Sequence, residues 1–252
     1  MTQEKHSGSL NQGLVIFIIL AFLTLMEFLI AITNQSLLLL SIAAIIKAGL
    51  VMYYYMHIYK LAEADDETDR QTDAWKLTTN RLGLWLFILS DAFLFAGLLV
   101  SRFNLLGLTR PDLNQYLGLL VTAVLLASSF FMNRAETQMR LGDLKGFLIS
   151  TTVTLVLGIG FLAGVVGVEW RDAPLAVGDS AYSAVFFMMT GMHAFHVLTG
   201  VIFLGIIINN GRRGLYSAEK HWAVEAATVY WHFIDVVWIF FYPALYLIGR
   251  LS

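Results

Sequence analysis

The chain has 252 residues, of which 58% are hydrophobic and only 13% are charged, and its formal net charge is −2. A soluble globular chain carries about 25% charged residues. A chain this apolar cannot cover its surface in water, so we conclude that its solvent is lipid. The small net charge gives no reason to expect a nucleic-acid partner. The sequence has no cysteine, which excludes disulfides, iron–sulfur clusters, c-type haem attachment and copper sites built on thiolates.

Hydrophobic stretches of membrane-spanning length dominate the sequence. A spanning helix needs roughly 20 mostly apolar residues, and helix is favoured because a backbone exposed to lipid must satisfy its own hydrogen bonds. We therefore predict an all-α fold, a polytopic membrane protein of seven transmembrane helices. The predicted spans are Gly13–Thr33, Ser36–Met56, Leu82–Ser101, Tyr116–Met132, Gly146–Gly167, Ala181–Ile208 and Ala226–Ile248.

The basic residues between these spans predict the orientation. With seven spans, eleven Lys and Arg residues fall on the side of the N-terminus and four on the other side. Short loops rich in Lys and Arg remain on the cytoplasmic side. We expect the N-terminus to be cytoplasmic and the C-terminus to lie outside.

A hydrophilic break divides the chain unequally. It runs from Tyr59 to Asn80 and is acidic. We predict a two-helix hairpin over residues 1–60, an acidic cytoplasmic linker over residues 61–80 and a five-helix bundle over residues 81–252. The break is either a solvated loop, a joint between two formerly separate subunits, or both.

Two opposite charges occur on the first two predicted helices. Glu27 lies in the first helix and Lys47 in the second, and a very short turn joins the two. Either charge alone would be costly in a bilayer, so we predict a buried ion pair. The pair would fix the register of the hairpin, or it would face a neighbouring subunit.

Asp91 occupies the centre of the third predicted helix. A free carboxylate at this depth is too costly, so we expect a protonated or hydrogen-bonded acid. Such a group either locks the packing of the helices or takes part in proton transfer, and the residues alone leave both open.

The last two predicted helices carry further polar groups at membrane depth. His193 and His196 are three residues apart and share one helix face, while His232 and Asp235 lie on the last helix and Glu225 at its inner end. A pair of histidines could bind a metal or haem, but such sites need more ligands. We favour neutral imidazoles that bond across the bundle, with Asp235 as one candidate partner. We predict no metal site and no catalytic residue in this chain.

Two motifs in these helices resemble a known family. The run Phe186 to Gly200 contains Thr-Gly-Met-His-Ala-Phe-His-Val, which resembles the Thr-Gly-x-His-x-x-His-Val motif of haem-copper oxidase subunit III. The run Glu225 to Trp238 is similar to the Glu-Ala…Tyr-Trp-His-Phe-x-Asp-x-x-Trp signature of that family. One departure is Asp91, where the family usually has Glu, and this weakens the transfer of a proton-related role to this residue.

The hairpin resembles a different polypeptide. The run Ile46 to His57, which includes Lys47, is similar to the small prokaryotic subunit IV of these oxidases, and Glu27 fits its preceding helix. This resemblance implies a fusion of subunits IV and III in a prokaryotic cytoplasmic membrane. The alternative is that the hairpin is made of the first two helices of subunit III itself.

The resemblance implies a supporting role within a respiratory complex. The chain would pack on oxidase subunits I and II, which carry the haem and copper, and would have no cofactor of its own except bound phospholipid. It would stabilise the oxygen-reducing, proton-pumping core and sustain proton uptake, with polar roles for Asp91, His193, His196, Glu225, His232 and Asp235. A larger respiratory supercomplex is a further expectation.

Competing hypotheses are an accessory protein of nitric oxide reductase, which the segment Leu84 to Phe103 also resembles, and a transporter or proton channel. The lack of inverted repeats argues against the transporter.

Overall fold

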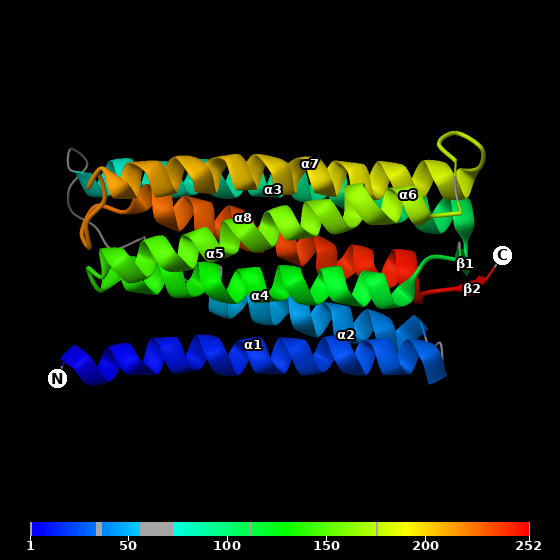
Figure 1. Ribbon diagram of the computed structural model, residues 1–252, viewed down its shortest axis with the longest axis horizontal. Helices are drawn as coiled ribbons and strands as arrows, with labels where there is room; N and C mark the ends of the chain where they lie inside the picture. Colours follow the sequence, from blue (N-terminus) through cyan, green and yellow to red (C-terminus); the bar gives the residue numbers. More distant parts are fainter. Residues whose placement is uncertain (1, 34–36, 56–72, 111, 175, 252) are drawn as a thin grey trace.

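The structure is a computed structural model that describes residues 2–33, 37–55, 73–110, 112–174 and 176–251, and these are almost entirely helical (Figure 1). Of the predicted linker over residues 61–80, only residues 73–80 are described, as the start of a helix. The rest of that prediction lies outside the described residues.

Long helices run side by side along one axis (Figure 1). In chain order the helical elements are α1 (Thr2–Thr33), α2 (Leu37–Leu50) with the π-helical η1 (Val51–Tyr55), α3 (Asp73–Leu106), α4 (Gln115–Arg140), α5 (Leu144–Leu162) with η4 (Ala163–Glu169) and α6 (Trp170–Asp172), α7 (Ala181–Arg212), and α8 (Trp222–Tyr242) with η5 (Pro243–Leu247). In the described part of the chain, six helices are long and apolar enough to cross a membrane, and a shorter apolar helix covers Leu38–Tyr54. This confirms the predicted class, a polytopic all-α membrane protein.

The helices extend beyond the apolar stretches that predicted them. The span expected over Tyr116–Met132 is part of α4, which continues to Arg140. Caps and glycines, and not the ends of the apolar runs, decide these boundaries. The side chain of Asn114 accepts a hydrogen bond from the Leu117 amide at the start of α4, and Gly142, at φ 77°, makes the turn into α5.

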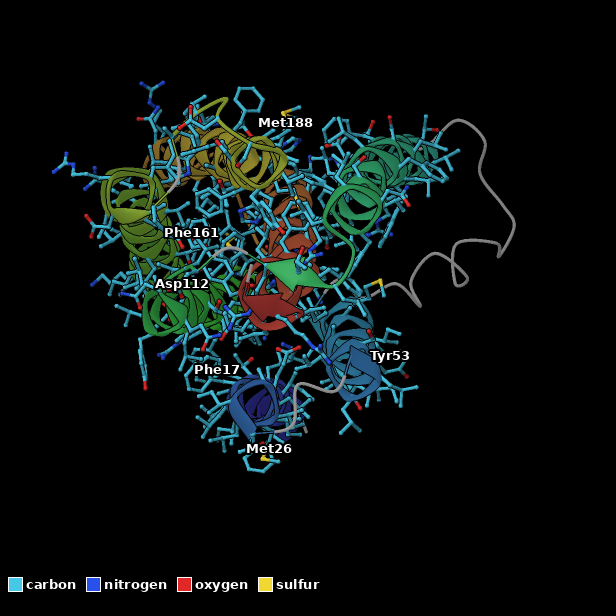
Figure 2. All side chains as sticks on the ribbon, turned by 90° about the vertical axis from the view of Figure 1, so that its right-hand side faces the viewer. Phe17, Met26, Tyr53, Asp112, Phe161 and Met188 are labelled. Atoms are coloured by element: carbon cyan, nitrogen blue, oxygen red, sulfur yellow. The ribbon has the colours of Figure 1, made fainter. Side chains whose placement is uncertain are left out.

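Helix α8 lies at the centre of the bundle (Figure 2). In an apolar stretch of 18 residues within Trp222–Leu247, 78% of the residues are buried inside the protein. In the corresponding stretch of Thr79–Leu106, 11% are buried. Both parts of the chain contribute to this burial, since α2 and η1 of the hairpin pack against α8, as do α3, α4 and α7. Helix α1 lies against α2 and α4.

Small residues let the bulky side chains of α8 and η5 come close to their neighbours. A Cβ atom at Gly158 of α5 would lie 2.5 Å from the Trp231 ring, and one at Gly118 of α4 would lie 2.7 Å from the Tyr246 ring. Neither contact is possible for a larger residue without movement of the ring. Close approach at small residues is a typical packing device of membrane helices, where lipid provides no hydrophobic driving force between helices.

A short clip closes the end of the bundle where the C-terminus lies. Strand β1 (Thr109–Arg110) pairs in parallel with β2 (Arg250–Leu251), while the N-terminus lies at the opposite end of the molecule (Figure 1). Ends on opposite sides agree with an odd number of passages along the bundle axis. The direction of the chain relative to the cytoplasm stays a prediction.

Arg102 holds this clip to α3. Arg102 lies one residue beyond the predicted span Leu82–Ser101, but α3 continues to Leu106 and the residue is fully buried. Its guanidinium donates hydrogen bonds to four carbonyl oxygens, those of Ala244 (2.7 Å), Gly107 (2.7 Å), Thr109 (2.9 Å) and Ile248 (2.9 Å). Two of these carbonyls follow the C-terminal end of α3, one belongs to η5 and one to the residue after η5, where helix dipoles favour a cation. A bond from a charged donor contributes about 1.5–3 kcal/mol, so Arg102 fixes the last turn of the chain.

Candidate functional site

The predicted polar residues fall into four places around α8. The hairpin holds Glu27 and Lys47, and a pocket between α3 and α7 holds Asp91 and His196. The α7–α8 interface and the buried side of α8 hold His193, His232 and Asp235. The end of the bundle near the start of α8 holds Glu225.

The hairpin charges form a fully buried ion pair. The Nζ atom of Lys47 donates a hydrogen bond to Oε2 of Glu27, and both side chains have no solvent-exposed surface. The pair spans the two antiparallel helices α1 and α2. The second carboxylate oxygen of Glu27, Oε1, makes no hydrogen bond within the described residues.

His193 is a packing residue of the α7–α8 interface. Its Nε2 atom lies 3.1 Å from the carbonyl oxygen of Ile234, which can only accept, so Nε2 carries a proton. The imidazole lies against the rings of Trp238 (centroid distance 4.8 Å) and Phe161 (5.3 Å). His193 therefore binds the backbone beside Asp235 and not the Asp235 side chain that the sequence offered as a candidate.

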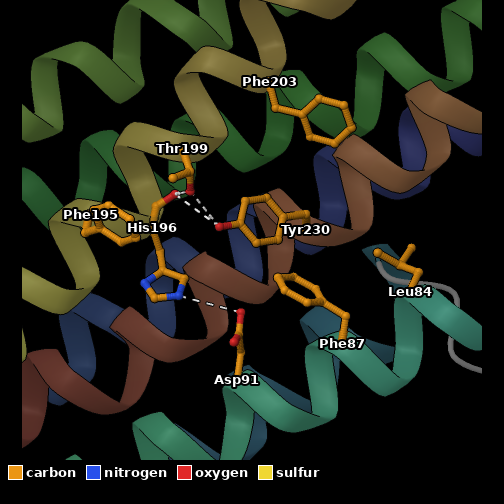
Figure 3. Close-up of a pocket in the computed structure, with 8 residues that line it drawn as sticks. All are labelled: Leu84, Phe87, Asp91, Phe195, His196, Thr199, Phe203 and Tyr230. Atoms are coloured by element: carbon orange, nitrogen blue, oxygen red, sulfur yellow. Dashed lines mark hydrogen bonds and ion pairs between the residues drawn. The ribbon is translucent and has the colours of Figure 1, made fainter.

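His196 faces Asp91 across the gap between α7 and α3 (Figure 3). Its Nδ1 atom lies 2.7 Å from the carbonyl oxygen of Met192 and must donate to it. Its Nε2 atom lies 3.6 Å from Oδ2 of Asp91. Nδ1 therefore holds the proton of a neutral imidazole. A bond between Nε2 and Oδ2 requires one further proton, carried either by Nε2 or by the carboxyl group of Asp91.

A pocket of about 440 Å³ opens beside this pair. Its walls are mostly apolar and come from three helices, with Leu84 and Phe87 on α3, Phe195 and Phe203 on α7, and Tyr230 on α8 (Figure 3). The Tyr230 hydroxyl lies 2.8 Å from Oγ1 of Thr199, which donates to the carbonyl of His196. Sequence reasoning did not assign Tyr230 and Thr199 to this site. Both occur in the quoted motifs, but only the packing of α7 on α8 brings them together.

Glu225 joins three helices at one end of the bundle. Its carboxylate lies 3.2 Å from Arg81 of α3, 3.6 Å from Arg140 of α4 and 3.4 Å from His221. Arg140 also bonds to Glu136 on its own helix. These side chains are partly exposed, so water and ions weaken each pair, and the cluster acts chiefly as a tie between α3, α4 and α8.

The buried side of α8 carries the two remaining predicted residues. His232 has no exposed surface and Asp235 is 1% exposed. Asp235 lies near Ser129 of α4 and within electrostatic range of Lys47 of α2.

A further buried acid, Glu169 of η4, was missed because the predicted span ended at Gly167. It is 2% exposed, and its Oε2 atom accepts a hydrogen bond of 2.6 Å from the Tyr246 hydroxyl. The signal was present in the sequence as an acid directly after an apolar run.

The histidines of α7 do not share a ligand site, since His193 turns to α8 and His196 to α3. Across the described residues, no group of three or more His, Cys, Asp or Glu side chains is arranged to hold a metal ion. The geometry of this chain thus offers buried hydrogen bonds and ion pairs, and it defines a polytopic helical membrane protein.

Comparison with known proteins gives the family. The family described as "Cytochrome c oxidase subunit III" matches residues 6–250. Cytochrome c oxidase subunit 3 of Gadus morhua is 35% identical over 179 residues, which cover 66% of this chain and 68% of the relative. The corresponding proteins of Xenopus laevis and Scyliorhinus canicula are 36% and 34% identical over the same shares of each chain. The chain belongs to the cytochrome c oxidase subunit III family.

Substitutions of Glu27 and Lys47 test how much their ion pair stabilises the protein. Lys47→Met leaves Glu27 buried without its partner, so we expect a loss of about 3–5 kcal/mol in stability, the usual cost of breaking a buried pair. The double change Glu27→Leu with Lys47→Met removes both polar groups and should recover most of that loss. Thermal denaturation of the purified protein, with yield from membranes as a second readout, measures both. Equal damage from the single and the double variant would contradict an energetic coupling of these residues.

Proposed function

We propose that this chain is a non-catalytic subunit that supports the oxygen-reducing, proton-pumping core of a respiratory haem-copper oxidase. The observation that carries the proposal is the family match over residues 6–250. Membership of this family implies association with the other oxidase subunits, and the proposed partners are subunits I and II, which would hold the haem and copper. The role of the chain would be to stabilise that core and to keep lipid at its side.

The geometry of the polar groups supports a structural role. Glu27 and Lys47 pair within the hairpin, His193 binds a backbone carbonyl, and Glu225 ties three helices. These contacts hold helices to one another, while the outer faces of α1, α3 and α7 are rich in exposed apolar side chains. Such faces suit lipid tails and neighbouring membrane helices.

Location and ancestry complete the proposal. We place the chain in a prokaryotic cytoplasmic membrane with a cytoplasmic N-terminus, since the basic residues favour that orientation. The similarity of the hairpin to subunit IV favours a fusion. The family match, which starts at residue 6 and so includes the hairpin, favours the alternative that the hairpin is native to subunit III.

Phospholipid is the proposed ligand. An apolar groove of about 280 Å³ runs between α3 and α8 and is lined by Phe95, Leu99, Phe233 and Phe240 among others. The hairpin packs on the same helix α8. The apolar lining suits part of an acyl chain, and a basic side chain at the membrane surface would attract the phosphate.

Bound lipid is tested by delipidation. We expect phospholipid to remain with the purified complex after washing in detergent. Its forced removal should lower stability and activity, and added phospholipid should restore both. A narrower test is Ala96→Trp, which fills the groove, with Ala92→Ser on the same wall as a mild control. Ala96→Trp should reduce the phospholipid retained per complex. A complex without phospholipid at this chain that keeps full activity and stability would contradict the proposal.

Substitutions at Asp91 test whether this residue supports the complex through helix packing. Asp91→Asn keeps the shape of the side chain, and its amide can donate to Nε2 of His196, so we expect normal assembly and a change in sustained oxygen consumption of less than about twofold, as for a substitution that preserves contacts. Asp91→Leu removes the partner of His196 and should reduce retention of the chain. The measurement is oxygen consumption over many turnovers with subunit content checked in parallel, and with chain-depleted complex as the reference. Normal assembly with markedly shortened activity in Asp91→Asn would instead assign Asp91 to proton supply.

A further inference from the structure

The polar pair of Asp91 and His196 lies in a pocket that a molecule from the lipid can enter. Both residues line the cavity of about 440 Å³ between α3 and α7 (Figure 3). Their side chains are 17% and 10% exposed, so a molecule in the pocket can reach both. The walls include Phe87 and Phe195, which are 49% and 58% exposed, so the pocket opens on the outer surface of the bundle.

The pair lacks a hydrogen-bond donor. Nε2 of His196 and Oδ2 of Asp91 are 3.6 Å apart, which is too far for a hydrogen bond, and Oδ2 has no bonding partner within the described residues. Nδ1 of His196 already donates to the Met192 carbonyl, so Nε2 of the neutral imidazole presents a lone pair. An ionised Asp91 and a neutral His196 therefore present two acceptors with no proton between them.

Aromatic rings surround the two acceptors. Phe87, Phe195, Phe203 and Tyr230 line the same pocket, and the rings of Phe87 and Tyr230 have centroids 6.1 Å apart (Figure 3). The faces of aromatic rings attract organic cations. A carboxyl group among aromatic rings is thus the combination that recognises an alkylammonium group.

The number of protons that a ligand can donate narrows its chemistry. A primary ammonium has three N–H donors, so one group can donate to both Asp91 and His196 while its charge compensates the carboxylate. An alcohol has one donor and no charge, so it would leave one acceptor without a partner. A metal ion such as Ca²⁺ takes six to eight oxygen ligands, whereas this pocket is mostly apolar and offers one carboxyl group.

We propose that this pocket binds a lipid-soluble primary amine. The ammonium group lies between the carboxyl group of Asp91 and Nε2 of His196, and the alkyl chain lies against the apolar walls. Such an amine is charged at neutral pH, because its pKa resembles that of a lysine side chain, about 10.4. The pocket shares no lining residue with the groove proposed for phospholipid, and the proposal does not depend on the identity of the partner subunits.

Photolabelling of the purified protein, with whatever subunits accompany it, tests the proposal. The probe is dodecylamine with a photoreactive diazirine on its alkyl chain, and mass spectrometry locates the labelled peptides. We expect labelling of the segments of α3 and α7 that line the pocket. An excess of unlabelled dodecylamine should suppress this labelling, whereas dodecanol at the same concentration should not, because it lacks the charge. Equal suppression by dodecanol, or no label in these segments, would overturn the proposal.

Variants of the pocket show whether the carboxylate holds the amine. Asp91→Asn keeps the shape but removes the charge, so the apparent affinity for the probe should fall by about tenfold or more, the effect of losing a bond to a charged group. Asp91→Glu keeps the carboxylate and should retain labelling. Glu169→Gln, which alters a buried acid outside the pocket, should leave labelling unchanged.

A second variant addresses the space in the pocket. Leu84→Trp narrows the cavity without touching the polar pair, and it should also reduce labelling. Equal affinity in Asp91→Asn and the unmodified protein would overturn the proposal. If Asp91→Asn yields no protein, Leu84→Trp and the comparison with dodecanol decide, and unchanged labelling in Leu84→Trp would overturn the proposal equally.

Discussion

Lipid cannot solvate a polar group, and this constraint organises the whole structure. Every ionisable side chain at membrane depth must find its partner within the protein. Helix α8 supplies many of these partners because it is the most buried span. The indole N–H of Trp231 donates to Ser128 and that of Trp238 donates to Thr122, both at 2.9 Å, which ties α8 to α4. On its other sides α8 receives a hydrogen bond from His193 of α7 and packs against α2 and η1 of the hairpin.

This arrangement is compatible with the proposed role of the chain as a supporting subunit. Its polar groups are used internally, so its outer faces are left apolar and suited to lipid and to neighbouring helices. The ends of the bundle are held separately. Arg102 fixes the C-terminal turn through four carbonyl oxygens, and Glu225 links three helices at the opposite end. The pocket beside Asp91 and His196 is the exception, because it opens a polar pair towards the surface.

The sequence predicts what depends on neighbours along the chain. Spans were found because hydropathy is a local property, and Glu27 was matched with Lys47 because the two lie on consecutive helices joined by a short turn. Partners on helices distant in sequence could not be predicted. Nothing local indicates that α3 lies beside α7, so the contact of Asp91 with His196 needed the structure. Arg102 and Glu169 were missed for a related reason, since their helices extend past the apolar runs and carry these charges into buried positions. The division into hairpin, linker and bundle stays a prediction, because most of the linker lies outside the described residues.

The central claim is that this member of the subunit III family supports an oxidase without a redox centre of its own. Its most direct test is purification of the tagged chain from native membranes in mild detergent, followed by identification of the accompanying subunits and of bound haem and metal. The account predicts that oxidase catalytic subunits accompany the chain with their haem and copper. Once these partners are removed, the chain itself should hold neither. Recovery of the chain alone, its recovery with nitric oxide reductase subunits, or stoichiometric haem or copper on the separated chain would contradict the account.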